Sequence, residues 1–178
     1  LMFEPQIAIF KKIKIKYKNK KNIKIYNCAI SDKSALKTIY INRHDLTSGL
    51  SVFNKKSSNY LKIKAKLFGT TSSGMILEKV KVKTKKLSEI IKLNNTKKID
   101  LVKIDTEGHE YEVLKGIQEN IKKIKYILIE FRNDKIYLSY NSKKIHNYLT
   151  KNNFVLKNTY KFPFTTWEDR FYFNKRFK

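Results

Sequence analysis

The densest group of reactive side chains in this sequence lies between residues 103 and 112, in the run KIDTEGHEYE. The run holds four carboxylates and a histidine, in a chain that has 15 acidic residues against 40 basic ones. Carboxylates and imidazoles transfer protons in enzymes. Asp105 follows an apolar stretch that we interpret as a strand buried on both faces, so we expect its side chain to point into a ligand-binding crevice.

Other residues of this run have simpler explanations. Glu110 and Glu112 fall at the start of a predicted helix, whose dipole stabilises acidic side chains there by about 0.3–1 kcal/mol. Gly108 permits a tight turn between strand and helix. Asp105, Glu107 and Glu110 offer oxygen ligands for a divalent cation, but their spacing is not diagnostic of a metal site and we expect none.

The periodicity of apolar residues predicts one α/β domain over residues 1–178, built on an open, mostly parallel sheet with an antiparallel C-terminal strand. The run IDLVKI, the amphipathic helix after it and the apolar run YILIEF predict a βαβ unit. Irregular composition predicts an insertion at residues 42–74, with a strand at 60–68. Further strands are expected at 22–31, 36–41, 78–84, 99–104, 126–131, 154–156 and 170–174. Helices are expected from Glu4-Pro5, from Thr84 or Lys85 to Leu93, at 110–121, and through 145–149 to an end at 152–153.

Ligands of doubly wound sheets bind beyond the carboxyl ends of the strands, so the polar residues that end each predicted strand are candidates for function. These residues are Glu4, Ser31 with Asp32, the segment 105–107, and Glu130.

The formal net charge of +25 suggests a polyanion as partner, because basic surfaces release counterions from nucleic acids. The excess is nearly all lysine, however, and nucleic-acid recognition leans on the arginine fork. We therefore expect a solvated lysine-rich surface and no nucleic-acid partner. The single cysteine, Cys28, lies in an apolar run, and no stretch reaches the roughly 18–20 apolar residues of a membrane span. These features favour a cytoplasmic protein.

Residues 101–117, LVKIDTEGHEYEVLKGI, resemble the signature of the FkbM family of methyltransferases, in which a strand ending in Lys-Ile-Asp leads through an acidic-Gly-x-Glu turn into a helix ending in Leu-Lys-Gly. FEP at 3–5 resembles the end of the family's second strand, and NCAISD at 27–32 its third. TKKLSEII at 84–91 is similar to the helix before the signature, and ILIEF at 127–131 to the fifth strand. The resemblance implies a Rossmann-like class I methyltransferase fold.

The resemblance also implies a function: S-adenosyl-L-methionine-dependent O-methylation of a hydroxyl on a sugar, glycan or secondary metabolite. It places Glu4 at the cofactor's ribose, although Glu4 is also a candidate helix N-cap. It places Ala29, Ile30 and Ser31 along the adenine, and Asp32 at the exocyclic amine.

On the acceptor side, the resemblance places Asp105 and Glu107 where the methyl group meets the substrate hydroxyl, with Lys103 modulating their charge. His109 has the ordinary pKa of a general base, roughly 6.5. The family does not fix a histidine at this position, so we expect His109 to be a partly exposed turn residue.

Family members begin with a strand and a glycine-bearing loop, which this sequence does not contain before Glu4. We expect the chain to be a fragment that binds the cofactor poorly and methylates nothing by itself; micromolar affinity in calorimetry would contradict this. We expect the acceptor to be chosen by residues 42–78. The alternative is a non-catalytic polyanion- or nucleic-acid-binding protein on a decayed methyltransferase scaffold.

Overall fold

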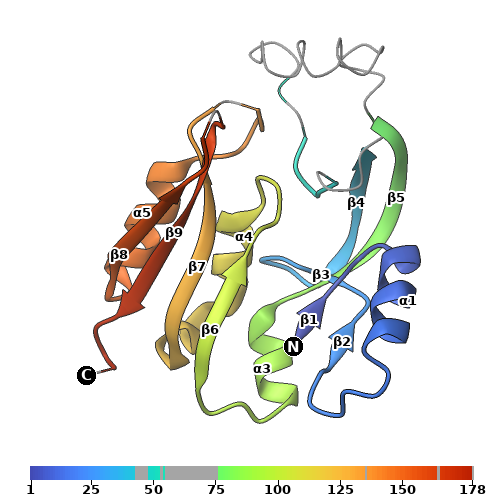
Figure 1. Ribbon diagram of the computed structural model, residues 1–178, viewed down its shortest axis with the longest axis horizontal. Coiled ribbons are helices and arrows are strands. Elements are labelled where there is room, and N and C mark those ends of the chain that lie inside the picture. Colours follow the sequence, from blue (N-terminus) through green and yellow to red (C-terminus); the bar gives the residue numbers. More distant parts are fainter. Residues whose placement is uncertain (43–47, 53, 55–75, 135, 164, 178) are drawn as a thin grey trace.

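The computed structural model describes residues 1–42, 48–52, 54, 76–134, 136–163 and 165–177. Its strands form three hydrogen-bonded sheets, with the orders β1-β2, β3-β5-β4 and β6-β7-β9-β8 (Figure 1). Alternation of strands and helices along the chain confirms the predicted α/β class. The strand predicted at residues 60–68, and most of the predicted insertion, lie outside the described residues.

The N-terminal part contains β1 (Met2–Phe3), α1 (Ile7–Lys16) and β2 (Ile25–Tyr26), with β1 and β2 parallel. Helix α1 begins two residues after Pro5, with Gln6 rather than Glu4 as its N-cap. Glu4 still stabilises this end, because its Oε1 accepts the backbone N–H of Gln6 at 2.7 Å. The expectation that Glu4 is the N-cap of the helix is therefore wrong, because the N-cap lies two residues later.

The single strand expected at residues 22–31 is divided in two. After β2, the chain bends at Asn27, whose side-chain amide donates to the carbonyls of Glu4 and Pro5 at 2.9 and 3.1 Å. The chain then continues as β3 (Ala29–Ile30), which pairs in parallel with β5 (Ile76–Lys85) of a different sheet. The side chain of Asn27 thus connects this bend to the segment just before α1. A pattern of apolar residues cannot predict such a polar contact.

Strand β4 (Ala35–Asn42) pairs antiparallel with β5. In β5, Val82 and Thr84 are buried, whereas the lysines that alternate with them are exposed, as the strict alternation predicts. Helix α3 (Leu87–Leu93) follows and buries Leu87, Ile90 and Ile91.

The C-terminal part contains the predicted βαβ unit: β6 (Ile99–Ile104), α4 (Glu110–Ile117) and β7 (Ile124–Arg132), with β6 and β7 parallel. A 3₁₀ helix, η2 (Gln118–Lys123), replaces the last predicted turn of the α-helix. Helix α5 (Ser142–Lys151), β8 (Phe154–Lys161) and β9 (Trp167–Asn174) complete the chain. The antiparallel C-terminal strand is confirmed, because β9 pairs antiparallel with both β7 and β8.

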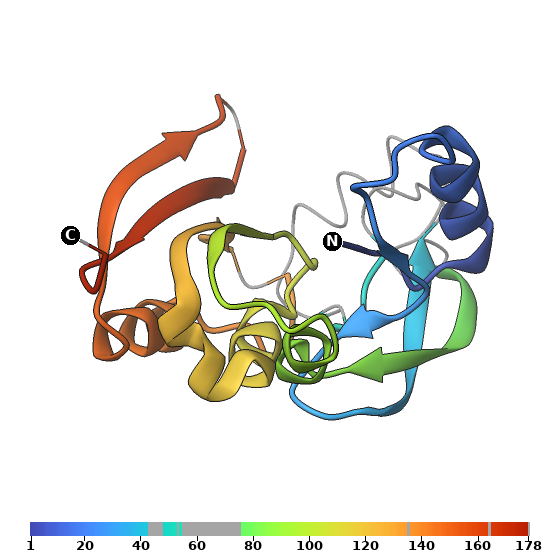
Figure 2. The same cartoon turned by 90° about the horizontal axis from the view of Figure 1, so that it is seen from below.

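Helices α3, α4 and α5 lie in a row on one face of the β6–β9 sheet (Figure 2). The main core lies between this row and the sheet. From β7 it takes Ile127, Ile129 and Phe131, all 0% exposed, which alternate along the strand as a single buried face requires. The intervening residues Leu128 and Glu130 therefore project from the opposite face of the sheet.

Two expectations about the sheet are wrong. The strands form three sheets, and their longest ladders, β4 with β5, β7 with β9 and β8 with β9, are antiparallel. Strand β6 is not buried on both faces: Leu101 is 52% exposed, and Ile104 alone is buried. The physical reason is that the helix row covers one face of β6, and that among the described strands β7 alone pairs with it. None of the described helices is long and apolar enough to cross a lipid bilayer.

Candidate active site

The turn between β6 and α4 carries the acidic residues singled out in the sequence. Glu107 and Gly108 both have positive φ angles, 52° and 89°. A Cβ atom at Gly108 would lie 2.4 Å from the ring of Tyr137, so this position needs glycine both for its conformation and for space.

Glu110 closes this turn. Its Oε1 accepts hydrogen bonds from the backbone N–H groups of Thr106 and Gly108, at 3.0 and 3.1 Å, and from the hydroxyl of Thr106 at 3.2 Å. The side chain is 1% exposed, and burial raises its pKa to about 7. Glu110 therefore organises the turn by direct hydrogen bonds, which goes beyond the helix-dipole role that the sequence suggested.

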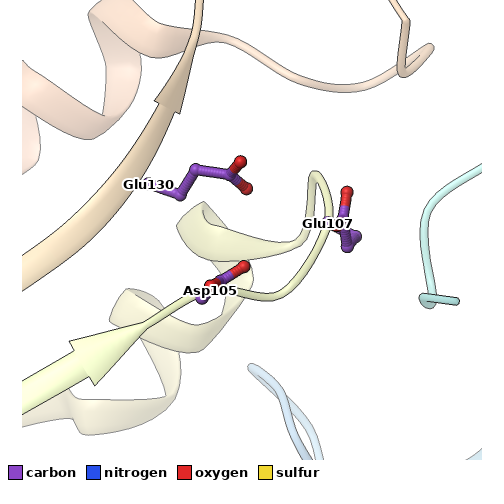
Figure 3. Close-up of side chains that lie close together, drawn as sticks. All are labelled: Asp105, Glu107 and Glu130. Carbon is purple, nitrogen blue, oxygen red and sulfur yellow. The ribbon is translucent and has the colours of Figure 1, made fainter. Parts of the chain in front are cut away.

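Asp105 and Glu107 meet a third carboxylate, Glu130 at the end of β7. One carboxylate oxygen from each residue lies within 4.8 Å of the others. Figure 3 shows Glu130 directed from β7 toward the turn that carries the other two. The three residues, called the acidic cluster below, lie at the carboxyl ends of two neighbouring parallel strands, where ligands of α/β sheets bind.

Two cations border the acidic cluster. Lys103 Nζ lies 3.1 Å from Asp105 Oδ2, and both side chains are about half exposed. The guanidinium of Arg132 is buried, and its Nη1 lies 3.6 Å from Glu107 Oε2 and 3.5 Å from Glu130 Oε1. Lys103 thus stands beside Asp105, as expected.

Tyr137 and Trp167 hold Arg132 in place through their rings, whose centroids lie 5.5 and 5.4 Å from the guanidinium carbon. The hydroxyl of Tyr137 also donates a 2.5 Å hydrogen bond to Glu107 Oε2. Glu107 is therefore fixed by a charged and a neutral partner, whereas Asp105 remains accessible.

Glu130 is the least compensated member of the acidic cluster. It is 7% exposed, and its Oε2 atom has no hydrogen-bond partner among the described atoms. Burial and the neighbouring Glu107 carboxylate raise its pKa to about 8, against the opposing effect of Arg132. A carboxyl group with this pKa is mostly protonated at pH 7, with about a tenth of it ionised, and it releases its proton as the pH rises through 8.

The other side of the turn contacts the end of β3. His109 Nε2 lies 2.9 Å from the hydroxyl of Ser31. His109 is 9% exposed, so the expectation of a partly exposed turn residue is wrong. Burial, together with the positive charges of Lys37 and Lys115, lowers its pKa to about 4, so it is neutral at physiological pH. The imidazole is enclosed and, with this low pKa, only weakly basic, so His109 is a poor candidate for the general base and instead holds the turn against the end of β3.

Asp32 lies beside this contact and pairs with two lysines, Lys37 Nζ at 3.1 Å and Lys115 Nζ at 3.3 Å. Burial alone would raise the pKa of Asp32, but hydrogen bonds from Lys37, Ser31 and Lys115 outweigh it and hold the pKa well below its ordinary value. Asp32 is therefore an anion at every physiological pH.

The remaining cofactor candidates have different surroundings. Ala29 and Ile30 are 9% and 8% exposed, and Ser31 is fully buried. A Cβ atom at Gly116 of α4 would lie 2.1 Å from the carbonyl oxygen of Ser31, so glycine there allows helix and strand end to touch. Glu4 is half-buried, and burial raises its pKa against the effect of the Gln6 hydrogen bond.

The sequence profile of the family described as Methyltransferase FkbM domain matches residues 1–156 of the 178-residue chain. The chain belongs to the FkbM methyltransferase family. Searches of curated proteins and of solved structures returned no significant match. The acidic cluster, the turn and the Ser31–His109 contact all lie inside the matched residues, and membership supports a methyltransferase-like enzyme.

Sequence reasoning named Glu130 as a strand end but gave it no role in this FkbM-family site, and it missed Arg132 and Tyr137. A signal was present: the apolar run of β7 ends in Glu130-Phe131-Arg132, and charged residues within a buried strand need partners. Tyr137 carried no such signal, because its approach to Glu107 depends on the path of the loop after β7.

Proposed function

We propose that this FkbM-family chain is an S-adenosyl-L-methionine-dependent O-methyltransferase that acts on a hydroxyl of a sugar, glycan or secondary metabolite. The observation that carries the proposal is the acidic cluster at the carboxyl ends of β6 and β7, next to the signature turn. The cofactor supplies an electrophilic methyl group on a sulfonium. The residues of the chain then have to orient the acceptor oxygen and receive its proton.

Asp105 is suited to receive that proton or to orient the hydroxyl. Its side chain is 45% exposed, so an acceptor can reach it, and Lys103 Nζ lies 3.1 Å from its Oδ2. Glu107 is 15% exposed and fixed by Tyr137, which suits it to positioning the acceptor.

The candidate cofactor residues fit this assignment in part. Glu4 directly follows β1, and its carboxylate accepts one hydrogen bond from the backbone N–H of Gln6. A carboxylate has further lone pairs that can accept from ribose hydroxyls. The side chain of Asp32 is 22% exposed and can accept from an amine. Ala29, Ile30 and Ser31 are buried, so we propose that they act through the packing of the strand end that carries Asp32.

We further propose that the acceptor is chosen by the insertion after β4. Its described part reaches the site: a Cβ atom at Gly49 would lie 3.1 Å from Cβ of Glu107. The backbone of Leu138 donates to the carbonyl of Val52 at 3.0 Å, which ties this part to the loop carrying Tyr137. Changes in the insertion would therefore be felt directly at the acidic cluster.

The test uses the protein expressed from its complete reading frame. Calorimetry measures S-adenosyl-L-methionine binding, and formation of S-adenosylhomocysteine measures turnover with sugar and polyol acceptors. We expect Asp105→Asn to lower kcat by about 10- to 100-fold. The loss is limited because proton transfer contributes less to the rate of methyl transfer than alignment of the acceptor oxygen with the methyl group does. The matched control is Asp100→Asn on the same strand, whose carboxylate pairs with Lys98 at 3.0 Å away from the site. Equal activity of the two variants would remove Asp105 from the mechanism.

One observation favours the non-catalytic alternative. Lys79, Lys81, Lys83 and Lys85 are all exposed on one face of β5, and alternate residues of a strand are about 6.6–6.8 Å apart. Such a lysine row can contact successive phosphates of a polyanion. The family match makes methyl transfer the first proposal, and polyanion binding the second.

A further inference from the structure

The acidic cluster brings three carboxylates close together in a chain that is otherwise strongly basic. Lys103 and Arg132 are the cations in its described ion pairs, and Arg132 also pairs with Asp134, Nη2 to Oδ2, at 3.3 Å. The distances from Arg132 Nη1 to Glu107 and Glu130 are 3.6 and 3.5 Å, longer than the roughly 2.7–2.9 Å of a strong charge-assisted hydrogen bond. Arg132 therefore compensates the carboxylate of Glu130 only partly.

A second observation points to a ligand. Glu130 is more than nine-tenths buried, its carboxylate is directed toward Asp105 and Glu107 (Figure 3), and its Oε2 has no partner among the described atoms. A buried carboxylate oxygen without a partner is costly, by about 1–3 kcal/mol or more. A group that binds this oxygen on the site side would remove the cost.

We propose that Asp105, Glu107 and Glu130 bind one divalent cation, each through a carboxylate oxygen. Oxygens that bind the same ion at about 2.1–2.4 Å lie at most about 4.2–4.8 Å apart, and the three oxygens here lie within 4.8 Å of one another. Carboxylate oxygens select hard cations, so Mg²⁺, Mn²⁺ and Ca²⁺ are the candidates. The exposed side of Asp105 leaves coordination positions for water or for an acceptor hydroxyl.

These three ligands differ from the ones that the sequence suggested, which were Asp105, Glu107 and Glu110. In the structure, Oε1 of Glu110 accepts the hydrogen bonds that close the turn. Glu130, which lies 25 positions after Asp105, takes its place because β6 and β7 are parallel neighbours. The expectation of no metal was based on the sequence spacing of Asp105, Glu107 and Glu110, and it did not consider Glu130.

Cation binding does not depend on methyl transfer, although a role for the cation in orienting the acceptor rests on the proposed function.

The direct test is a titration of the metal-free protein with Mn²⁺, following the electron paramagnetic resonance signal of free Mn²⁺, with Mg²⁺ and Ca²⁺ as competitors. We expect one Mn²⁺ per chain. Asp105→Asn and Glu130→Gln should each weaken binding by about 10-fold or more, since even residues outside the coordination shell cost 10- to 100-fold.

Asp100→Asn is the matched control and should bind Mn²⁺ within about twofold of the wild type, since a screened, exposed charge contributes little. If Glu130→Gln unfolds, Asp105→Asn decides alone, because Asp105 is exposed and outside the core. The proposal is overturned if the wild type binds no Mn²⁺, or if Asp105→Asn binds as well as Asp100→Asn. Mn²⁺ binding without turnover would refute the proposed function alone, and turnover without Mn²⁺ binding would refute the cation site alone.

Discussion

Ser31 and His109 join two distant parts of the chain, with 2.9 Å between the serine hydroxyl and the imidazole Nε2. Ser31 directly follows β3, and His109 is the N-cap of α4. This contact holds the turn that carries Asp105 and Glu107 against the strand end that carries Asp32. The acceptor side and the candidate cofactor side of the site are thus mechanically connected.

The buried His109 predicts a dependence of stability on pH. Its pKa is about 4 in the folded chain and 6.5 when unfolded, so the unfolded state binds the proton more readily. The contribution is complete above pH 6.5 and is lost as the pH falls toward 4, by about 3 kcal/mol. Because Glu110 and Glu130 titrate in overlapping ranges with the opposite sign, the quantity to measure is the difference in unfolding free energy between wild type and His109→Gln. We expect this difference to shrink from pH 7 to pH 4; a constant difference would mean that His109 is not held neutral.

Gly116 provides a test of the packing of α4 on β3. Alanine there should favour the helix by about 1 kcal/mol, but its Cβ would meet the Ser31 carbonyl oxygen at 2.1 Å, and backbone cannot easily yield. We expect Gly116→Ala to lower the free energy of unfolding by about 1–3 kcal/mol in urea titrations. Gly49→Ala, whose nearest contact is a side-chain atom at 3.1 Å, is the control and should cost less. A stabilised Gly116→Ala protein would show that the helix and the strand end are not in contact.

The parts of the fold that were predicted from the sequence are those set by local patterns. The apolar run of β7, the alternation in β5 and the amphipathic helix α5 each carry their own period. The split of residues 22–31 depends on Asn27 reaching Glu4 and Pro5, more than 20 positions away, and periodicity does not register such contacts. The same limit applies to the acidic cluster, because Glu130 joins Asp105 through strand pairing alone.

Tyr137 tests how Glu107 is held. Tyr137→Phe removes the donor to Glu107 Oε2 in a site that is mostly shielded from water, so we expect a loss of about 1–3 kcal/mol in unfolding free energy. Tyr160→Phe, at a residue 48% exposed, should change little. In a double-mutant cycle, Tyr137→Phe should cost less in a Glu107→Gln background. Additive effects would show that the two side chains do not interact in solution.

The lysine row of β5 separates the two proposed functions. Replacing Lys79, Lys81, Lys83 and Lys85 by Gln should weaken binding to heparin or single-stranded DNA, and should reduce the salt dependence of that binding. Methyl transfer should stay within about twofold of the wild type, because the four lysines are exposed and have no described contact with the acidic cluster, and exposed charges act weakly at a distance. A parallel loss of turnover would place the polyanion at the enzyme's own substrate site.

Methyl transfer at the acidic cluster is the activity that we propose for this FkbM-family chain. The most direct measurement is formation of S-adenosylhomocysteine and methylated product by the protein expressed from its complete reading frame, for wild type, Asp105→Asn and Asp100→Asn. We expect equal amounts of the two products with a sugar or polyol acceptor, turnover by Asp100→Asn at the wild-type rate, and a loss of about 10- to 100-fold in Asp105→Asn. Turnover that is the same in all three proteins, or no turnover with any hydroxyl acceptor, would contradict it.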